Sequence, residues 1–269
     1  ILDAQWPEGF WVAPGVGYSP KYKATVWQVI YLAALGAPRT EAVERACARV
    51  LDESRLPDGR FSAKKTAQGA IPCLGGNLLR ALMQLGCEDP RMAESVDALG
   101  EMVLRDGYCC RYNALRDQNG DWPRRMRDGL PCAWGAIKAL GAFAEVPEEQ
   151  RSPVVQDAIE AGSALLLDGN LADGDYPTAT EPSPLWQLFG FPLGYRSDLL
   201  EALEVLGKLG VELGPKVTPA LEVVRRKRDE SGRWMLEHTP GNTWAGFGKI
   251  GEANKWVTLR ALRALRQWE

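Results

Sequence analysis

The sequence has one histidine, His238, among 269 residues, and its 32 Lys and Arg residues nearly balance its 35 Asp and Glu residues. A net charge of −3 gives no reason to expect a nucleic-acid partner, because proteins that bind nucleic acids carry a basic excess. Long hydrophobic runs are also missing: the longest, Val29–Ala37, is far too short to cross a bilayer. We therefore expect neither a nucleic-acid partner nor a transmembrane segment.

Cysteine is scarce as well. Six cysteines in so long a chain do not make a disulfide scaffold, so we expect reduced thiols in a cytoplasmic protein. No signal peptide is visible. The chain begins with Ile1 rather than Met, so we expect some N-terminal sequence, which could include a signal peptide, to be missing.

Strand-like alternation is absent over any useful length, and the patterns that are present are helical. Five segments are helix-length and rich in Ala and Leu: Ala24–Leu35, Leu74–Leu85, Ala133–Phe143, Asp198–Leu209 and Trp256–Trp268. Each of the first four is followed by a more polar, amphipathic segment: Glu41–Ser54, Arg91–Arg105, Pro153–Leu167 and Lys216–Arg228. The sequence therefore predicts an all-α protein in which two kinds of helix alternate.

A glycine turn followed by an aromatic residue recurs along the chain. It is written Leu-Pro-Asp-Gly-Arg-Phe at Leu56–Phe61, and the turn glycines fall at 9, 59, 107, 174 and 232, with steps of 50, 48, 67 and 58 residues. This spacing indicates a repeat architecture. A helix that is apolar on nearly every side must be buried on nearly every side. The alternation therefore predicts an inner ring of helices inside an outer ring, built from five to six helix hairpins.

The links that lead from an outer helix to the next inner helix are long: 58–72, 106–131, 168–194 and 230–254. In a double ring all of them lie at one end, which is also the end where the inner helices begin. Loops of this length inside a compact domain are usually functional. We therefore expect the working face at that end.

The repeated turn resembles the repeat of the terpenoid cyclase/protein prenyltransferase superfamily, whose members are α/α toroids. The matching segments are Asp58–Phe61, Asp173–Tyr176 and Ser231–Trp234, and Gln5–Trp11 is similar to the glutamine-and-tryptophan motif of the cyclases. The resemblance covers essentially the whole chain and implies a single toroid domain over residues 1–269.

The catalytic signatures of the superfamily are not matched. Class II cyclases use an Asp-x-Asp-Asp motif, but Asp173–Tyr176 has no third acid. Zinc-dependent prenyltransferases carry Asp-Gly-Cys on one turn and a His one repeat later; Asp106–Cys109 has one extra residue, and no His follows. The Cys-His pair of the lanthionine cyclases is also missing.

Four cysteines fall at the expected working end: Cys73, Cys109, Cys110 and Cys132. Thiolates that converge from adjacent repeats can bind Zn²⁺ tetrahedrally, with His238 able to complete the site. The alternative is that all four are small packing residues, because free cysteine is among the most buried residue types.

Cationic residues crowd the same end. The candidates for binding an anionic substrate group are Lys64, Arg111, Arg124, Arg125 and Arg196. Inner-helix N-termini at this mouth would favour the same anion. The alternative is that long polar loops carry charges in any case.

Polar residues also recur within the inner segments. Alignment on their Leu-Gly ends puts Asn77, Gly135 and Asp198 in one row, and Arg80, Lys138, Glu201 and Arg260 in the next. Asp198 is either ion-paired with a neighbour of the Arg80 or Lys138 type, or a functional acid. Asp121 and Asp175 share a Gly-Asp-aromatic-Pro context and are either paired acids or turn residues.

Ten tryptophans are present. We assign Trp122, Trp186 and Trp244 to the lining of an apolar cavity, where aromatic faces stabilise carbocations. Phe61 and Trp234 are assigned to locking one repeat onto the next.

Together these features predict an enzyme of the cyclase or prenyltransferase type that acts on an amphipathic substrate with an anionic head. Asn77 and the basic residues would bind the substrate, and His238, Asp198, Asp121 or Asp175 would move protons. The alternatives are a zinc-dependent hydrolase or lyase on the same scaffold, and a binding or scaffold protein that has lost the chemistry.

Overall fold

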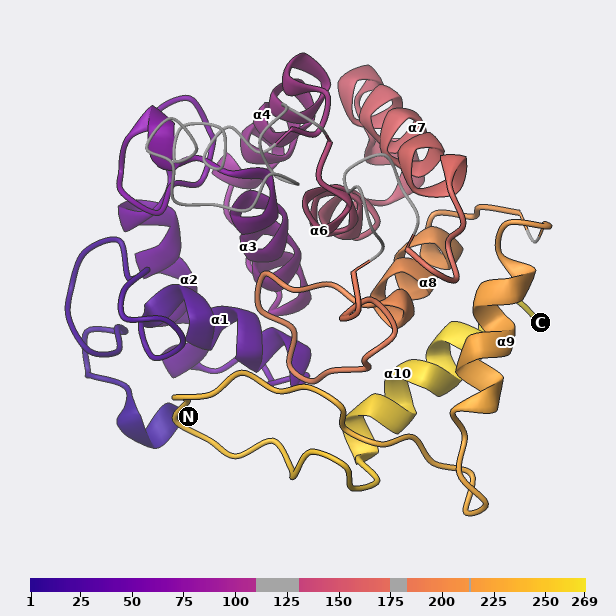
Figure 1. Ribbon diagram of the computed structural model, residues 1–269. Helices are drawn as coiled ribbons and strands as arrows, with labels where there is room; N and C mark the ends of the chain where they lie inside the picture. The colour runs from indigo at the N-terminus through magenta and orange to yellow at the C-terminus, as the bar shows by residue number, and fades with distance from the viewer. Residues whose placement is uncertain (110–130, 175–182, 213) are drawn as a thin grey trace, which may run out of the picture.

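A computed structural model describes residues 1–109, 131–174, 183–212 and 214–269 (Figure 1). In these ranges the chain forms nine α-helices and no β-strand, which confirms the all-α prediction. The Ala- and Leu-rich segments become α1 (Thr25–Ala34), α3 (Pro72–Gln84), α6 (Ala133–Phe143), α8 (Leu199–Lys208) and α10 (Lys255–Arg266). The amphipathic segments become α2 (Glu41–Glu53), α4 (Arg91–Asp106), α7 (Pro153–Asp168) and α9 (Thr218–Arg226).

Capping side chains mark the start of several helices, and glycines in left-handed conformation mark the end of others. Thr40, Ser152, Asp198 and Asn254 each accept a hydrogen bond from a backbone N–H of the first turn that they precede. The predicted Leu-Gly ends close α1, α3 and α8, where Gly36, Gly86 and Gly210 have φ of 67°, 72° and 76°. Glycine reaches this left-handed region without a steric penalty, so the helices stop there.

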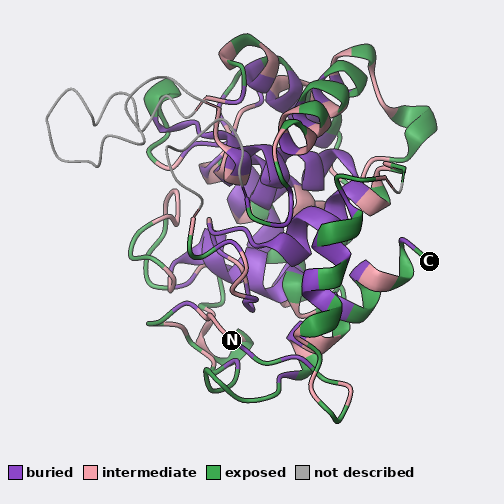
Figure 2. Ribbon diagram, turned by 45° about the vertical axis from the view of Figure 1, so that its right-hand side comes forward, coloured by how far each residue is buried: buried purple, intermediate pink, exposed green. Residues whose placement is uncertain are grey.

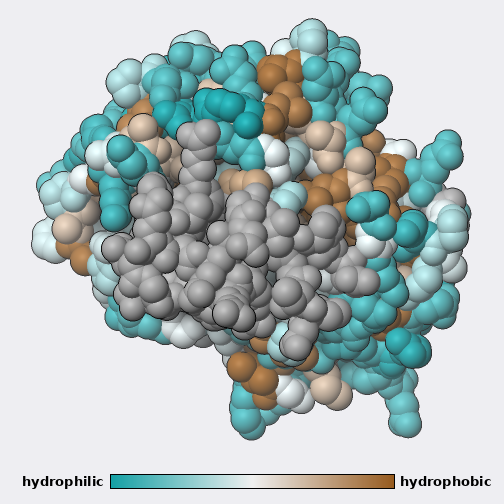
Figure 3. Space-filling view, turned by 45° about the horizontal axis from the view of Figure 1, so that its top comes forward, coloured by the Kyte–Doolittle hydropathy of each residue, from teal (hydrophilic) through white to brown (hydrophobic). Residues whose placement is uncertain are grey.

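Burial separates the two kinds of helix (Figure 2). Nine of the ten residues of α1 and ten of the eleven residues of α6 are buried. In contrast, only five of thirteen are buried in α2 and four of nine in α9. The surface in Figure 3 is correspondingly mostly hydrophilic, with its hydrophobic side chains in separate small groups.

The buried helices pack in the order of the chain, α1 on α3, α3 on α6, α6 on α8 and α8 on α10. Figure 1 shows them arranged in an arc around the loop of residues 183–198. Each amphipathic helix lies outside this arc and packs on its neighbours, as α2 does on α1 and α7 does on α6. The arc therefore surrounds a centre that only loops and side chains fill.

Helix α10 departs from the prediction that every Ala- and Leu-rich helix is buried on nearly all sides. Only four of its twelve residues are buried, and Leu259 and Leu262 are 38% and 47% exposed. The reason is its position at the end of the row: within the described part of the chain, α8 and α9 are the helices that pack extensively against it.

The recurring turns share left-handed backbone at their glycines: φ is 90°, 85°, 56°, 69° and 80° at Gly9, Gly59, Gly107, Gly174 and Gly232. Glycine adopts this conformation without a steric penalty, which explains why it recurs in the motif. Two of the turns also approach an outer helix closely. A Cβ on Gly9 would lie 2.8 Å from Arg45 of α2, and one on Gly59 would lie 2.9 Å from Ala98 of α4.

The aromatic residues of the turns are buried where they were expected to lock the repeats. Phe61 is 2% exposed and Trp234 is fully buried. The Trp234 indole donates a hydrogen bond to the carbonyl of Val224 in α9 at 2.7 Å. The locking role predicted for both residues is consistent with this placement.

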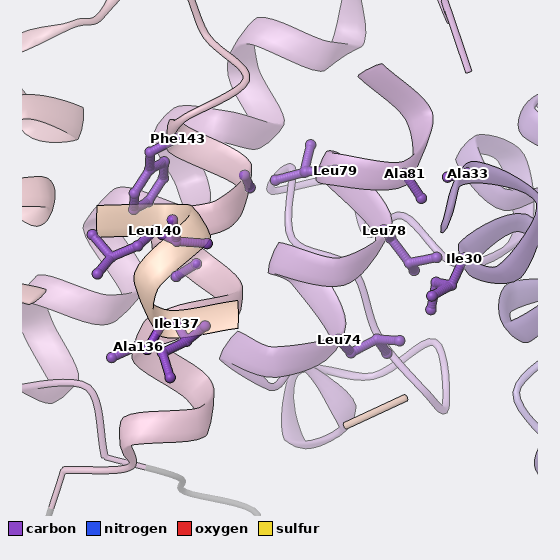
Figure 4. Close-up of a cluster of buried hydrophobic side chains, with 14 of the residues drawn as sticks. Ile30, Ala33, Leu74, Leu78, Leu79, Ala81, Ala136, Ile137, Leu140 and Phe143 are labelled. Carbon is purple, nitrogen blue, oxygen red and sulfur yellow. The ribbon is translucent and has the colours of Figure 1, made fainter. Parts of the chain in front are cut away.

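The interface between α3 and α6 is the most extensive contact between the described helices. Leu78 and Leu79 of α3 and Ile137 and Leu140 of α6 belong to the apolar core drawn in Figure 4. A Cβ added to Gly76 would lie 2.3 Å from the carbonyl group of Lys138, so the two backbones approach closely at this position.

We expect Gly76→Ala to lower the free energy of unfolding by about 1–3 kcal/mol, because backbone rather than a flexible side chain must move. Gly75→Ala is the matched control, since its Cβ meets only the end of the Leu99 side chain, at 3.3 Å. Alanine is also about 1 kcal/mol better than glycine inside a helix, so Gly75→Ala should keep or raise stability. Urea denaturation measures both, and equal effects of the two substitutions would contradict the close backbone approach.

Candidate functional site

A cavity of about 350 Å³ lies at the centre of the arc. All five helices of the arc contribute to its lining, and so do Phe191 and Leu193 of the central loop. A volume of this size is within the range of small-molecule sites in proteins, at its lower end.

Charged residues form part of the lining of the cavity. The predicted row of Arg80, Lys138, Glu201 and Arg260 lines it, so four different helices bring their charged residues together as the alignment indicated. Two further charged residues, Glu204 and Arg263, line it as well. The sequence analysis missed both, although each lies three residues after a member of the row and therefore on the same helix face.

Other residues of the lining are apolar. They are Ile30 and Ala33 of α1, Ala81 of α3, the loop residues Phe191 and Leu193, and Trp256 of α10. The rings of Phe191 and Trp256 stack with centroids 5.2 Å apart and an interplanar angle of 13°. The cavity is therefore amphipathic.

The charged residues of the lining belong to two buried clusters, and the first is centred on Lys138. The Lys138 ammonium donates to both Glu201 carboxylate oxygens, at 2.8 and 2.6 Å, and is 1% exposed. Arg80 donates to the same Glu201 from α3 at 3.2 Å. Burial lowers the pKa of Lys138, although the charge of Glu201 opposes this shift.

The second cluster is centred on Arg260. Its guanidinium donates to both oxygens of Asp198, at 2.9 and 3.0 Å, to Glu204 at 3.0 Å and to the carbonyl of Gly190 at 2.8 Å. Burial alone raises the pKa of Asp198, but the Arg260 charge and the bonds to this carboxylate outweigh it, and the pKa lies below the ordinary range. Burial raises the pKa of Glu204, and Arg260 offsets only part of that effect.

Asp198 is therefore the ion-paired acid, the first of the two alternatives, rather than a free acid. It is fully buried, and it also accepts from the N–H groups of Gly190 and Glu201 at 2.9 Å. Its partner is Arg260, the basic residue of the same predicted row that lies on α10, while Glu201 occupies Lys138 and Arg80.

The cavity opens at the end opposite to the one expected. Its exposed lining residues are Ala34, Gly36, Gln84, Leu259 and Arg263, which include the C-terminal ends of α1 and α3. Those ends carry the short links. The partial charge at helix C-termini is negative, so helix dipoles do not attract an anion here as the sequence analysis proposed.

The long-loop end is closed by residues 183–198. Asn77 donates to the carbonyl of Gly194 at 3.0 Å, Tyr195 packs edge-on against Trp27 at 5.1 Å, and Phe191 packs against Phe247 at 6.0 Å. Aromatic packing of this kind excludes water from the centre. Asn77, predicted to bind substrate, does line the cavity, at its inner end.

The other predicted residues that the structure describes lie away from the cavity. Trp186 is fully buried and packs on the turn at Gly174, where its indole donates to the carbonyl of Leu171 at 2.7 Å, so it locks a repeat rather than lining a pocket. Trp244 is 39% exposed and donates to the carbonyl of Lys23 at 2.9 Å. Lys64 is exposed in the loop after α2.

Arg196 and His238 are used within the central loop and its neighbour. Arg196 is 8% exposed and donates to the carbonyl of Leu185 at 2.7 Å. The backbone of His238 pairs with Gly190 and Phe191, and burial followed by the Arg196 charge lowers the pKa of its imidazole. Neither residue lines the cavity.

The described residues do not fit a metal. Within residues 1–109, 131–174, 183–212 and 214–269, no three His, Cys, Asp or Glu side chains are placed to hold an ion. Cys132 instead accepts the N–H of Gly135 at 3.4 Å and caps α6. Cys109 pairs through its backbone with Pro131, and Cys73 lies in the first turn of α3.

The remaining predicted residues lie outside the described part of the chain: Arg111, Asp121, Trp122, Arg124, Arg125, Cys110 and Asp175. Within the described helices, none is long and apolar enough to cross a membrane.

Asp198→Asn tests the Arg260 cluster. Asparagine keeps a cap for α8 but leaves a buried guanidinium without its main counter-charge, so we expect a loss of about 3–5 kcal/mol in the free energy of unfolding at neutral pH. The control Glu222→Gln removes an exposed pair with Arg225 and should cost less than about 1 kcal/mol. Urea denaturation compares them, and similar costs would contradict the role of Asp198.

The stability difference between the natural chain and Asp198→Asn should also depend on pH. Because the pKa of Asp198 is lowered in the folded state, its stabilising contribution is complete above the ordinary aspartate pKa and is lost as the pH falls through the lowered one. The difference in stability between the natural chain and Asp198→Asn should therefore shrink in that acidic range. A difference independent of pH would contradict it.

A comparison of the sequence with protein-family models and with curated proteins found no match. Functional inference for this chain therefore starts from the geometry of the central cavity.

Proposed function

We propose that the nine helices form an α/α toroid. Support comes from the burial of the inner helices, from the order in which they pack, and from the short and long links at opposite ends. The loop before α10 also reaches the segment before α1, where Trp244 and Asn242 donate to the carbonyls of Lys23 and Lys21. This contact joins the two ends of the arc. The toroid agrees with the superfamily that the turns resemble.

We further propose that the central cavity is the active site of an enzyme and binds a small amphipathic molecule with an anionic group. The observation that carries this proposal is the mixed lining of the cavity, which combines charged side chains with apolar ones. Arg263 is the exposed cation at its mouth, and its guanidinium makes no hydrogen bond or ion pair with any described residue. A guanidinium is well suited to bind a carboxylate or a phosphate.

Two groups in the cavity support catalysis. Lys138 has a lowered pKa and Glu204 a raised one, and titratable groups with opposed shifts inside one cavity are typical of proton-transfer sites. The apolar part of the substrate would lie against Phe191, Leu193 and Trp256. A cyclase or prenyltransferase reaction is the prediction that the turn resemblance makes for this site.

A second candidate is a binding protein that has the toroid without its chemistry. The observation that favours it is that Asp198 and Glu201 are fully committed to ion pairs. Ligand binding at the cavity is common to both candidates, so binding is the first property to test.

Arg263→Ala should weaken the binding of inorganic pyrophosphate and of an isoprenoid diphosphate by about tenfold or more, because a charge-assisted hydrogen bond is lost. Arg266→Ala, on the next turn of the same helix and outside the cavity, is the control and should change affinity less than about twofold. Calorimetric titration measures both ligands. Equal affinity in the natural chain and Arg263→Ala would count against the anion site, and tighter binding of the isoprenoid compound than of pyrophosphate would support a role for the apolar lining.

A further inference from the structure

Most charged groups that line the cavity already have hydrogen-bond partners within the protein, and few remain available to a ligand. Lys138 and Glu201 satisfy each other, and Arg260 is occupied by Glu204, Asp198 and Gly190. Within the described residues, the other Glu204 oxygen, Oε1, makes no hydrogen bond and is not enclosed by protein. Arg263 is likewise without a partner there.

Glu204 Oε1 and the Arg263 guanidinium have opposite charge, and both residues line the cavity. Arg260 binds the Oε2 of Glu204, and Arg263 follows Arg260 by three residues on α10, about one helical turn further along that helix. A ligand that binds both groups needs a positive and a negative end on a short chain.

We propose that the natural ligand carries a protonated amine in addition to its anionic group, and that the amine binds Glu204 while the anion binds Arg263. The inference rests on the proposed function, because it assigns the chemical class of ligand for the same cavity. Such a ligand is a short zwitterion whose charged ends are joined by an apolar chain. The apolar lining residues Ile30, Ala33 and Trp256 would contact that chain.

The surroundings of Glu204 agree with an amine at this position. The charged groups that face it are Arg260 of α10, Arg80 of α3, and Asp198 and Glu201 of α8. Burial raises the pKa of Glu204, so the carboxyl group retains its proton to higher pH than an exposed glutamate does. An ammonium group at Oε1 would add a positive charge beside Glu204 and favour its ionised form, so amine binding and loss of the Glu204 proton are linked.

The test uses three probes of equal chain length, 5-aminopentanoate, pentanoate and pentylamine, in calorimetric titrations of the natural chain. We expect the two-headed probe to bind at least about tenfold more tightly than either single-headed probe, because each end adds a charge-assisted bond. Glu204→Gln should weaken pentylamine and 5-aminopentanoate but not pentanoate. Arg263→Gln should weaken pentanoate and 5-aminopentanoate but not pentylamine, and Arg266→Gln should change none of them.

The pH dependence provides a measurement that needs no variant. Affinity for pentylamine should rise with pH as Glu204 loses its proton, up to the range near pH 10 where the amine itself loses one. Affinity for pentanoate should show no such rise.

The outcomes separate this inference from the proposed function. Pentanoate bound through Arg263, with no gain from the amine in 5-aminopentanoate and no effect of Glu204→Gln on pentylamine, overturns the zwitterion and leaves the anion site standing. No binding of any probe overturns both.

Discussion

The buried ion pairs at the centre are the interaction on which the rest of the structure depends. Lys138, Glu201 and Arg80 join α6, α8 and α3, and Arg260 joins α10 to α8 through Asp198. Each charge is expensive to bury, and only the opposite charge from another helix offsets that cost. The helices therefore hold one relative placement, since any shift that separates a pair leaves an uncompensated charge in an apolar interior. The same pairs form the wall of the cavity.

Within the described residues, the central loop packs across one end of the arc, and the exposed residues of the cavity lining lie at the other end. Gly190 bonds with both Asp198 and Arg260, and Phe191 stacks on Trp256, so the loop is attached to the ion pairs and to the apolar wall together. Closure at the long-loop end leaves the mouth beside Gln84 and Arg263. Because helix C-termini surround this mouth, an anion there depends on guanidinium groups rather than on helix dipoles. In the proposed function, ligand specificity depends on individual side chains, chiefly Arg263 and Glu204.

Much of the helical framework could be predicted because it depends on residues that are close together in the sequence. The Leu-Gly ends, the caps and the two kinds of hydrophobic pattern each depend on residues within a few positions of one another. The glycine turns were recognisable for the same reason, although their packing against α2 and α4 was not. The charged row of Arg80, Lys138, Glu201 and Arg260 was also accessible, since equivalent positions of a repeat lie at equal depth in the arc. Asn77 of the other row also lines the cavity, whereas Gly135 and Asp198 of that row do not.

The sequence by itself determined the elements and the depth of the polar rows, and the tertiary structure decided which charges pair and where the cavity opens. Asp198 pairs with Arg260, a choice that follows from the approach of α10, an element 62 residues further along the chain. Trp186 was expected in the cavity and is buried beneath a turn, because the path of the central loop carries it there. Contacts between distant segments have no local signature in the chain. The working face was predicted at the wrong end for the same reason, since a long loop can fill the mouth of a cavity as readily as it can surround it.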